Sequence, residues 1–272
     1  MRRKQSAFTL IELLVVVAII ALLIAILLPS LGKAKARANT ARCLAQVRGL
    51  GMCVNLYVAD WRKMFPYSNT FAPAGGANPA EWTQLLRGVK GTDATGYGAT
   101  DKARLCPEAT ITKSGSPPWF GTAHLAWGGS QQTGVDPVTK KELTASYGLN
   151  GHVYAYTNDV NAIGGNASQS HSMTSNMVNE SQIPVFADMT WRHFTPHPGD
   201  AISPNNSMED PGPNNEAGTL PISYVMINRH NKAINVAFLD GHGDTVGLRD
   251  LYKLKWSRDW VTPANIPNLP AK

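Results

Sequence analysis

The feature that most constrains this chain is a long apolar run near its start, from Phe8 to Leu28. At about 1.5 Å of rise per residue, these roughly 21 residues can cross the hydrocarbon core of a bilayer as one helix. One acidic residue, Glu12, interrupts the run near its beginning. A carboxylate at mid-membrane costs on the order of 2.5 to 3.5 kcal/mol, and somewhat less near an end, so we expect Glu12 to meet a partner in the lipid.

The residues around this carboxylate resemble the leader and first helix of type IV prepilins and type II secretion pseudopilins. The resemblance rests on a short basic leader, residues 1–6, followed by Ala7-Phe8-Thr9-Leu10-Ile11-Glu12. It implies that a prepilin peptidase cuts between Ala7 and Phe8 and methylates the new amine. It also implies that Glu12 pairs with the amine of a neighbouring subunit during assembly. The residue before the cut is most often Gly in the family and is Ala here.

Two other interpretations of this segment stay open. A cleaved secretory signal would use Ala34-Lys35-Ala36 as its cut site, although a signal core has about 7 to 15 residues and rarely holds a Glu. A plain membrane anchor would need only the apolar run. Basic residues flank the run on both sides, so the charges do not decide its orientation. The resemblance implies a cytoplasmic N-terminus in the inner membrane and a periplasmic C-terminal domain.

A second pattern extends the helix beyond the membrane span. Pro29 ends the apolar run, and apolar or small residues then recur at steps of three and four from Leu31 to Trp61. This spacing predicts a helix with one apolar stripe on which a globular domain can pack. We therefore expect a leader at 1–7, a transmembrane helix at 8–28, the soluble half of the same helix at 29–62 and a globular domain at 63–272.

The sequence pattern of the globular part predicts a loop-rich α+β domain, because many Gly, Pro, Asn and Ser residues separate its short apolar runs. The runs favour a strand at Ile183–Asp188 and a C-terminal antiparallel meander of three strands, Ile222–Ile227, Ala233–Leu239 and Thr245–Leu248. A short helix is expected at 81–89, with long loops at 164–176 and 196–218. The resemblance implies a type IV pilin-like fold, with the long helix packed on a small antiparallel sheet.

A spacing near the C-terminus also resembles a bacterial subgroup of prepilin-like proteins. His230, nine further residues and then Asp240-Gly241 match the C-terminal signature of that subgroup. We expect each residue to fix its own turn, with Asp240 bonding backbone amides of the Asp-Gly turn and His230 capping the preceding one. A strand separates the two side chains by more than roughly 20 Å, which argues against one catalytic pair.

Three cysteines cannot all pair within one chain. Cys43 and Cys53 lie on the same predicted helix, about 15 Å apart along its axis, which is too far for a disulfide. Any disulfide must therefore use Cys106, and Cys43 is the better partner because it lies in the middle of the apolar stripe. Of the two possibilities, we favour three buried thiols that behave as small hydrophobes over the disulfide.

Charge and metal-ligand patterns limit the remaining functions. The net charge of +6 includes three charges in the leader, so the processed chain would carry +3 and no nucleic-acid partner is indicated. Major secretion pseudopilins bind calcium near the C-terminus. That resemblance makes Asp188, Asp240 and Asp244 candidate Ca²⁺ ligands.

The expected function is structural rather than enzymatic, as a subunit of a type IV pilus-like or type II secretion pseudopilus filament. Its expected partners are identical or related pilin-like subunits, the prepilin peptidase and the inner-membrane assembly platform. The alternative is a membrane-anchored envelope binding protein, or a metal-dependent hydrolase that uses His and Asp residues of the C-terminal domain. A filament subunit needs the register from Phe8 to Glu12, whereas the alternative needs only an apolar anchor.

Overall fold

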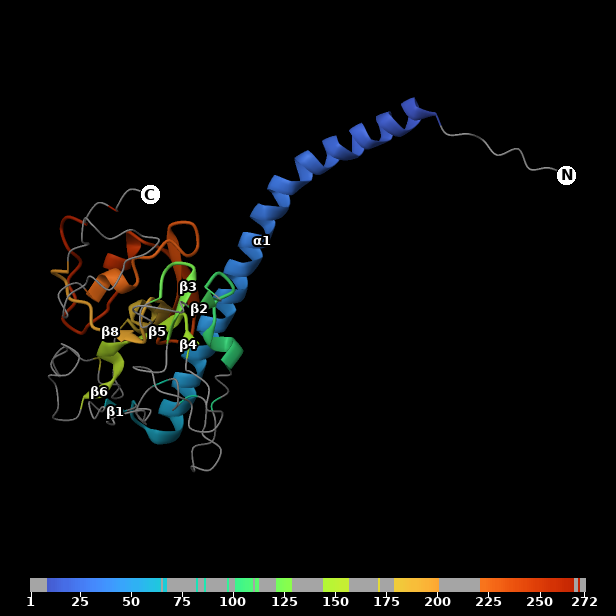
Figure 1. The fold of residues 1–272 in the computed structure, drawn as a ribbon. Coiled ribbons are helices and arrows are strands. Elements are labelled where there is room, and N and C mark those ends of the chain that lie inside the picture. The colour runs from blue at the N-terminus through green and yellow to red at the C-terminus, as the bar shows by residue number, and fades with distance from the viewer. Residues whose placement is uncertain are drawn as a thin grey trace. The chain divides into compact units, whose positions relative to one another are not determined.

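The computed structural model has one long N-terminal helix followed by short strands, which is an α+β layout (Figure 1). Contacts within the chain divide it into two compact units, Met1–Asn39 and Thr40–Lys272. The structure describes residues 9–64, 66–67, 82, 86, 97, 101–109, 111–112, 121–128, 144–156, 171, 179–200, 221–266 and 269.

Helix α1 extends from Leu10 to Trp61, which confirms the predicted C-terminal end of the helix. Pro29 lies inside it, and the next residue, Ser30, donates its hydroxyl to the carbonyl of Leu27 at 2.8 Å. In the first unit the apolar side chains of α1 are exposed. Within the described part of the chain, α1 is the one helix that is long and apolar enough to cross a membrane.

The part of α1 in the second unit buries one face. Steps of three and four residues keep a helix face in register, as the sequence pattern predicted. The buried residues are Cys43, Val47, Leu50, Gly51, Cys53, Val54 and Tyr57. Trp61 was expected on this stripe but is 52% exposed. Its ring stacks on Tyr57 and its indole N–H donates to the hydroxyl of Tyr97, so it closes the helix end at the surface.

The main sheet of the second unit has five strands in the order β10-β9-β7-β5-β8. All neighbours are antiparallel except β5 and β8, which are parallel. The strands are β5 (Tyr147–Asn150), β7 (Pro184–Asp188), β8 (His193–Phe194), β9 (Ala233–Phe238) and β10 (Gly243–Gly247). Three of them, β7, β9 and β10, lie at the predicted positions.

The prediction of Ile222–Ile227 as the first strand of the C-terminal meander is wrong. Pro221–Tyr224 forms the 3-10 helix η6, and β7 rather than this segment lies beside β9. The residues that follow continue with short-range bonds, from the amide of Val225 to the carbonyl of Ile222 and from Met226 to Ser223. A short apolar run cannot be told from a buried turn by its pattern alone.

Two smaller sheets complete the described strands, and β1 and β6 are seen side by side in Figure 1. The first pairs β1 (Pro66–Tyr67) with β6 (Ala155–Tyr156), and the second orders β2 (Ile111–Thr112), β3 (Leu125–Gly128) and β4 (Thr144–Ala145). The described residues also include four further 3-10 turns. They are η1 (Asp101–Arg104), η2 (Gly151–Val153), η4 (Glu180–Gln182) and η7 (Asp250–Lys253).

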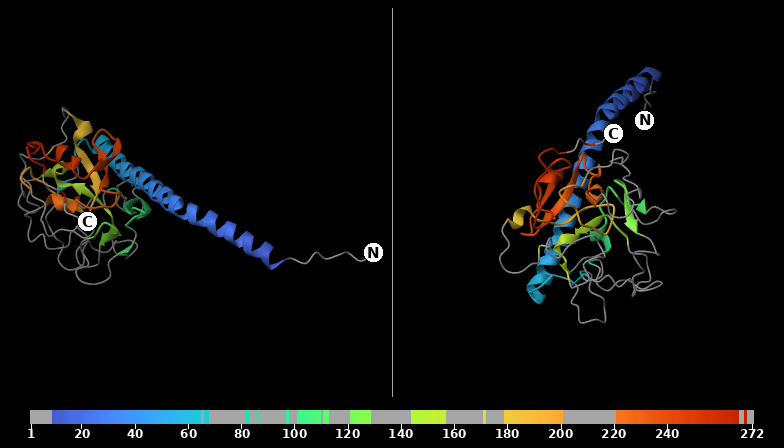
Figure 2. Two further views of the ribbon diagram at one scale, coloured as in Figure 1. Left: turned by 90° about the horizontal axis from the view of Figure 1, so that it is seen from above. Right: turned by 90° about the vertical axis from the view of Figure 1, so that its left-hand side faces the viewer.

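The inner strands of the main sheet, β5, β7 and β9, are buried on both faces. On one face Val47, Leu50 and Val54 of α1 pack with Leu149 and Phe186. Figure 2 shows the β9–β10 hairpin, in orange to red, beside α1. On the other face the C-terminal segment packs over the same strands. The hydrophobic cluster on this second face contains Ile234, Val236, Leu251, Tyr252, Trp256 and Trp260.

Most of the predicted helix at 81–89 and of the two predicted long loops lies outside the described residues. Within the helix segment, the amide of Leu86 donates to the carbonyl of Trp82 at 3.0 Å, which is the spacing of one α-helical turn. Both side chains are buried in the core beneath α1.

Candidate functional sites: the helix start and the buried disulfide cluster

The start of α1 is a reciprocal cap between Thr9 and Glu12. The amide and hydroxyl of Thr9 donate to Glu12 Oε2 at 2.9 and 2.8 Å, and the amide of Glu12 donates to Thr9 Oγ1 at 3.2 Å. This arrangement is a capping box, which satisfies backbone donors that a helix start leaves without partners. The pattern Thr-x-x-Glu was the signal for it. The predicted cleavage residues, Ala7 and Phe8, lie outside the described residues.

Asp240 and Gly241 form the turn between β9 and β10, as predicted. Asp240 Oδ1 accepts the backbone amide of His242 at 3.1 Å and also contacts the imidazole of His242. That imidazole stacks on Phe238 with ring centroids 4.3 Å apart. Gly241 has φ +88°, a left-handed conformation that favours glycine. This half of the signature is therefore a local turn motif.

His230 does not cap a turn, so that part of the prediction is wrong. Its Nδ1 lies 3.2 Å from Thr40 Oγ1, and its Nε2 lies 3.1 Å from Asp188 Oδ2. The preceding turn needs no such cap, because the amide of Lys232 donates to Asn228 Oδ1 and the amide of His230 itself donates to Ala233. The imidazole therefore takes no part in the turn and is buried between two polar partners, Thr40 and Asp188.

Asp188 joins His230 to a buried arginine. Its Oδ1 lies 3.0 Å from Nη1 of Arg229, and both side chains are fully buried. Asp188 Oδ2 also accepts the backbone amide of Asn235 at 2.8 Å. Burial raises the pKa of Asp188, but Arg229 and His230 outweigh it and hold the pKa below its usual value. Asp188 is therefore an anion at the centre of a buried network.

Arg229 was not among the residues that the sequence singled out. Besides Asp188, it donates to the backbone carbonyls of Thr122 and Ala123 at 2.8 and 2.9 Å, and to that of Ser146. One guanidinium thus holds several chain segments around the end of β7. Its position next to the signature residue His230 was the only sequence signal.

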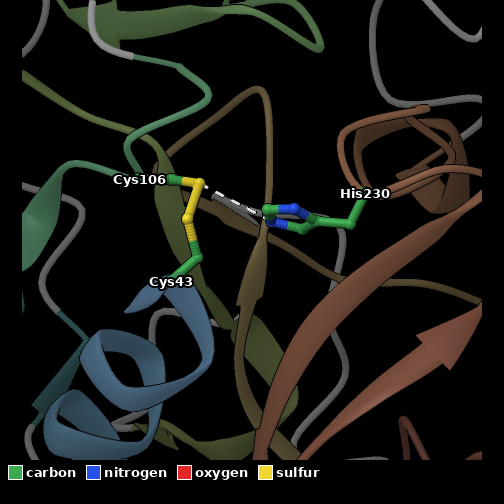
Figure 3. A group of neighbouring side chains, drawn as sticks. All are labelled: Cys43, Cys106 and His230. Atoms are coloured by element: carbon green, nitrogen blue, oxygen red, sulfur yellow. Dashed lines mark hydrogen bonds between the residues drawn. A yellow bond between two sulfur atoms is a disulfide. The ribbon is translucent and has the colours of Figure 1, made fainter. Parts of the chain in front are cut away.

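A disulfide joins Cys43 of α1 to Cys106, just after η1, with Cα atoms 5.0 Å apart. This is the better of the possible pairings by helix geometry, but the favoured expectation of three buried thiols is wrong for these two cysteines. Cys53 is a free, buried thiol, and its Sγ donates to the carbonyl of Tyr97. In Figure 3 the imidazole of His230 points at the disulfide, with Nε2 3.6 Å from Cys106 Sγ.

The candidate calcium ligands are not brought together in the described residues. Asp188 lies in the buried network, Asp240 in the hairpin turn, and Asp244 is exposed on β10, where it accepts the amide of Thr245. The group of potential metal ligands found in the described part of the chain consists of Cys43, Cys106 and His230. Their ligand atoms lie within 4.8 Å of one another.

Comparison with known protein families gives one match. Residues 2–28 match the family model of the prokaryotic N-terminal methylation motif. Comparisons with curated proteins and with solved structures give no match. The matched segment is a prepilin-type cleavage and methylation segment, which confirms the resemblance drawn from Ala7 to Glu12. The chain also has a long apolar N-terminal helix followed by antiparallel and mixed sheets, an α+β layout as in type IV pilin-like proteins.

Proposed function

We propose that the chain is a structural subunit of a type IV pilus-like or type II secretion pseudopilus filament. The match of residues 2–28 to the methylation motif is the observation that carries this proposal. In this account the chain is anchored by residues 8–28, with its N-terminus in the cytoplasm and its C-terminal domain in the periplasm. A prepilin peptidase removes residues 1–7, and the assembly platform adds the subunit to identical or related pilin-like chains.

The capping box supports a double role for Glu12. A cut between Ala7 and Phe8 leaves Thr9 and Glu12 in the mature chain, so the helix cap survives processing. An ionised carboxylate has about four acceptor sites, and Thr9 uses two of them through Oε2. Glu12 can therefore accept the methylated amine of a neighbouring Phe8 while it still caps its own helix.

The placement of the His and Asp residues argues against the anchored hydrolase. The side chains of His230 and Asp188 are fully buried and paired to each other, and Asp188 is also paired to Arg229. Asp240, in contrast, is bound to His242 in an exposed turn. A hydrolytic site needs several such groups around one accessible point. The described residues bring these candidates to different places, so the proposed role is structural.

Two substitutions at position 12 separate the charge from the cap. Glu12→Gln retains a capping acceptor without the charge, and Glu12→Leu has neither. We expect both variants to enter the membrane and to lose the leader, but filament yield to fall by about tenfold or more in both, because the neighbour's amine has no anionic partner in the lipid.

Filament yield, leader cleavage and membrane insertion are measured together for the parent and both variants. Parent-level filaments from Glu12→Gln with a deficit in Glu12→Leu would mean that the cap matters and the ion pair does not. Equal filament yields from all three chains would contradict the role of Glu12 in assembly, whereas no filaments from any of them, the parent included, would favour the anchored-protein alternative.

A further inference from the structure

The cluster of Cys43, Cys106 and His230 has a chemistry that the filament role does not use. Two sulfurs and one imidazole nitrogen lie together in the core, and the nitrogen also faces a buried carboxylate. We propose that the chain binds one Zn²⁺ at this place before its disulfide forms, through Cys43, Cys106, His230 and Asp188. Thiolate and imidazole ligands in a closed, four-coordinate site are the set that structural zinc prefers.

Two of the observed distances between ligand atoms fit a tetrahedral zinc ion. With a Zn–S bond of about 2.3 Å and Zn–N and Zn–O bonds of about 2.05 Å, ligand atoms lie about 3.6 Å apart for S and N and about 3.3 Å apart for N and O. The distance from Cys106 Sγ to His230 Nε2 is 3.6 Å. The distance from His230 Nε2 to Asp188 Oδ2 is 3.1 Å. Both distances are close to those expected between neighbouring ligands of one zinc ion, and His230 Nε2 is the atom that they share.

The fourth ligand needs only a side-chain movement. Two thiolates on one tetrahedral zinc ion lie about 3.8 Å apart, so the sulfurs of Cys43 and Cys106 must separate when they are not bonded to each other. Their Cα atoms are 5.0 Å apart, and rotation about the Cα–Cβ bonds changes the distance between the sulfurs without moving the backbone.

Contacts other than the disulfide hold the backbone of each ligand. The carbonyl of Cys43 accepts the hydroxyl of Tyr147, and the amide of Cys106 donates to Ser146 Oγ at 2.6 Å. The amide of His230 donates to the carbonyl of Ala233, and Asp188 belongs to β7 of the main sheet. These contacts keep the four ligands together in the reduced chain.

The charges around the site balance when zinc is present. Two thiolates and the carboxylate of Asp188 are neutralised by Zn²⁺ and the guanidinium of Arg229, which lies 3.0 Å from Asp188. Thr40 Oγ1, next to His230 Nδ1, can accept the N–H of the tautomer whose Nε2 binds the metal. The backbone amide of Asn235 and Arg229 orient the carboxylate from outside the ligand shell.

Zinc and the disulfide exclude each other, because both use the sulfurs of Cys43 and Cys106. The conversion of one into the other accounts for all protons and electrons. Binding of Zn²⁺ to the two thiols releases two protons and leaves both sulfurs as thiolates. A low-molecular-weight disulfide then accepts two electrons from these thiolates. The products are the bond between Cys43 and Cys106, two thiolates from the reagent and free Zn²⁺.

Cobalt titration of the full chain in detergent micelles tests the proposal. The disulfide is reduced under argon with a trialkylphosphine, which becomes its phosphine oxide with water as the oxygen source and adds no thiol ligand. We expect the reduced chain to bind one Co²⁺ with the visible bands of tetrahedral thiolate coordination, and Zn²⁺ to remove those bands. The oxidised chain of the same sequence should give no such spectrum.

Variants and melting curves complete the test. Cys106→Ser and His230→Gln should lose the tetrahedral spectrum, and Cys53→Ser should retain it because Cys53 is outside the site. Zn²⁺ should raise the melting temperature of the reduced chain and leave that of the oxidised chain unchanged. Absence of the spectrum in the reduced parent, or its persistence in Cys106→Ser, would overturn the zinc site. Neither result bears on filament assembly, which has its own readout.

Discussion

Among single residues, Asp188 is the one whose loss should cost the domain most. Asp188→Asn leaves the fully buried guanidinium of Arg229 without an anion. Breaking such a pair lowers the free energy of unfolding by about 3 to 5 kcal/mol. Urea denaturation of the full chain in detergent measures it. The matched control is Asp244→Asn on exposed β10, which should change it by less than about 0.5 kcal/mol. Equal losses would contradict the buried network.

For single residues, the sequence predicted local roles but not long-range partners. Asp240 and Gly241 were identified correctly because a turn is fixed by the chemistry of adjacent residues. The partners of His230 were not, since Asp188 is 42 positions away and reaches it only through the pairing of β7 with β9. The capping box at Thr9 was local and could have been found from its spacing.

At the scale of elements, the disulfide should stabilise the link between α1 and the segment after η1. It closes a loop with a sequence separation of 63, for which the chain-entropy relation gives about 4 kcal/mol. The double variant Cys43→Ala with Cys106→Ala should unfold in correspondingly less urea under non-reducing conditions. Cys53→Ala, which removes a buried thiol that is not part of a disulfide, is the control. Matching unfolding midpoints for the two variants would argue against a stabilising disulfide.

The contact between α1 and the main sheet depends on a small residue. A Cβ on Gly51 would lie 3.0 Å from Cβ of Ala237, whereas a Cβ on Gly49 would meet nothing within 4 Å. We expect Gly51→Leu to destabilise the domain by about 1 to 3 kcal/mol by overpacking. Gly49→Leu should be neutral or stabilising, because Leu favours helix over Gly. Thermal melting of both variants distinguishes packing from helix propensity, and a similar melting temperature for the two would rule packing out.

The elements that could be predicted were those with a sustained pattern. The stripe of α1 and the alternation of β9 and β10 are strong signals because many positions repeat them. The segment Ile222–Ile227 failed because its buried residues serve a turn after η6, and burial alone does not specify a strand. The parallel pairing of β5 with β8 joins short strands, whose register depends on the rest of the sheet.

At the scale of the whole molecule, buried histidines should make the fold sensitive to acid. Burial lowers the pKa of His152 from 6.5 to about 4, and it also lowers the pKa values of His171 and His193. These imidazoles stay neutral in the folded chain but protonate in the unfolded chain as the pH falls below about 6.5. The unfolded state then binds more protons, so the free energy of unfolding falls as the pH falls.

For His152 the loss accumulates between about pH 6.5 and 4 and reaches on the order of 3 kcal/mol. Asp188 adds a further loss at lower pH, because its lowered pKa gives stability that disappears as the carboxylate protonates in the folded chain. Urea denaturation at pH 7.5 and 5 measures the slope. His152→Gln should reduce the dependence of the free energy of unfolding on pH by the equivalent of about one proton. A free energy of unfolding that is the same at both pH values would contradict the lowered pKa of the buried histidines.

We propose that this α+β chain is made as a prepilin-type precursor and is processed before it enters a filament. Mass spectrometry of the N-terminal peptide, from a chain co-expressed with a prepilin peptidase, tests the processing directly. We expect a mature chain that begins with N-methylated Phe8 and retains Glu12. A chain that keeps Met1, or that begins after Ala36 as a cleaved secretory signal would, contradicts it.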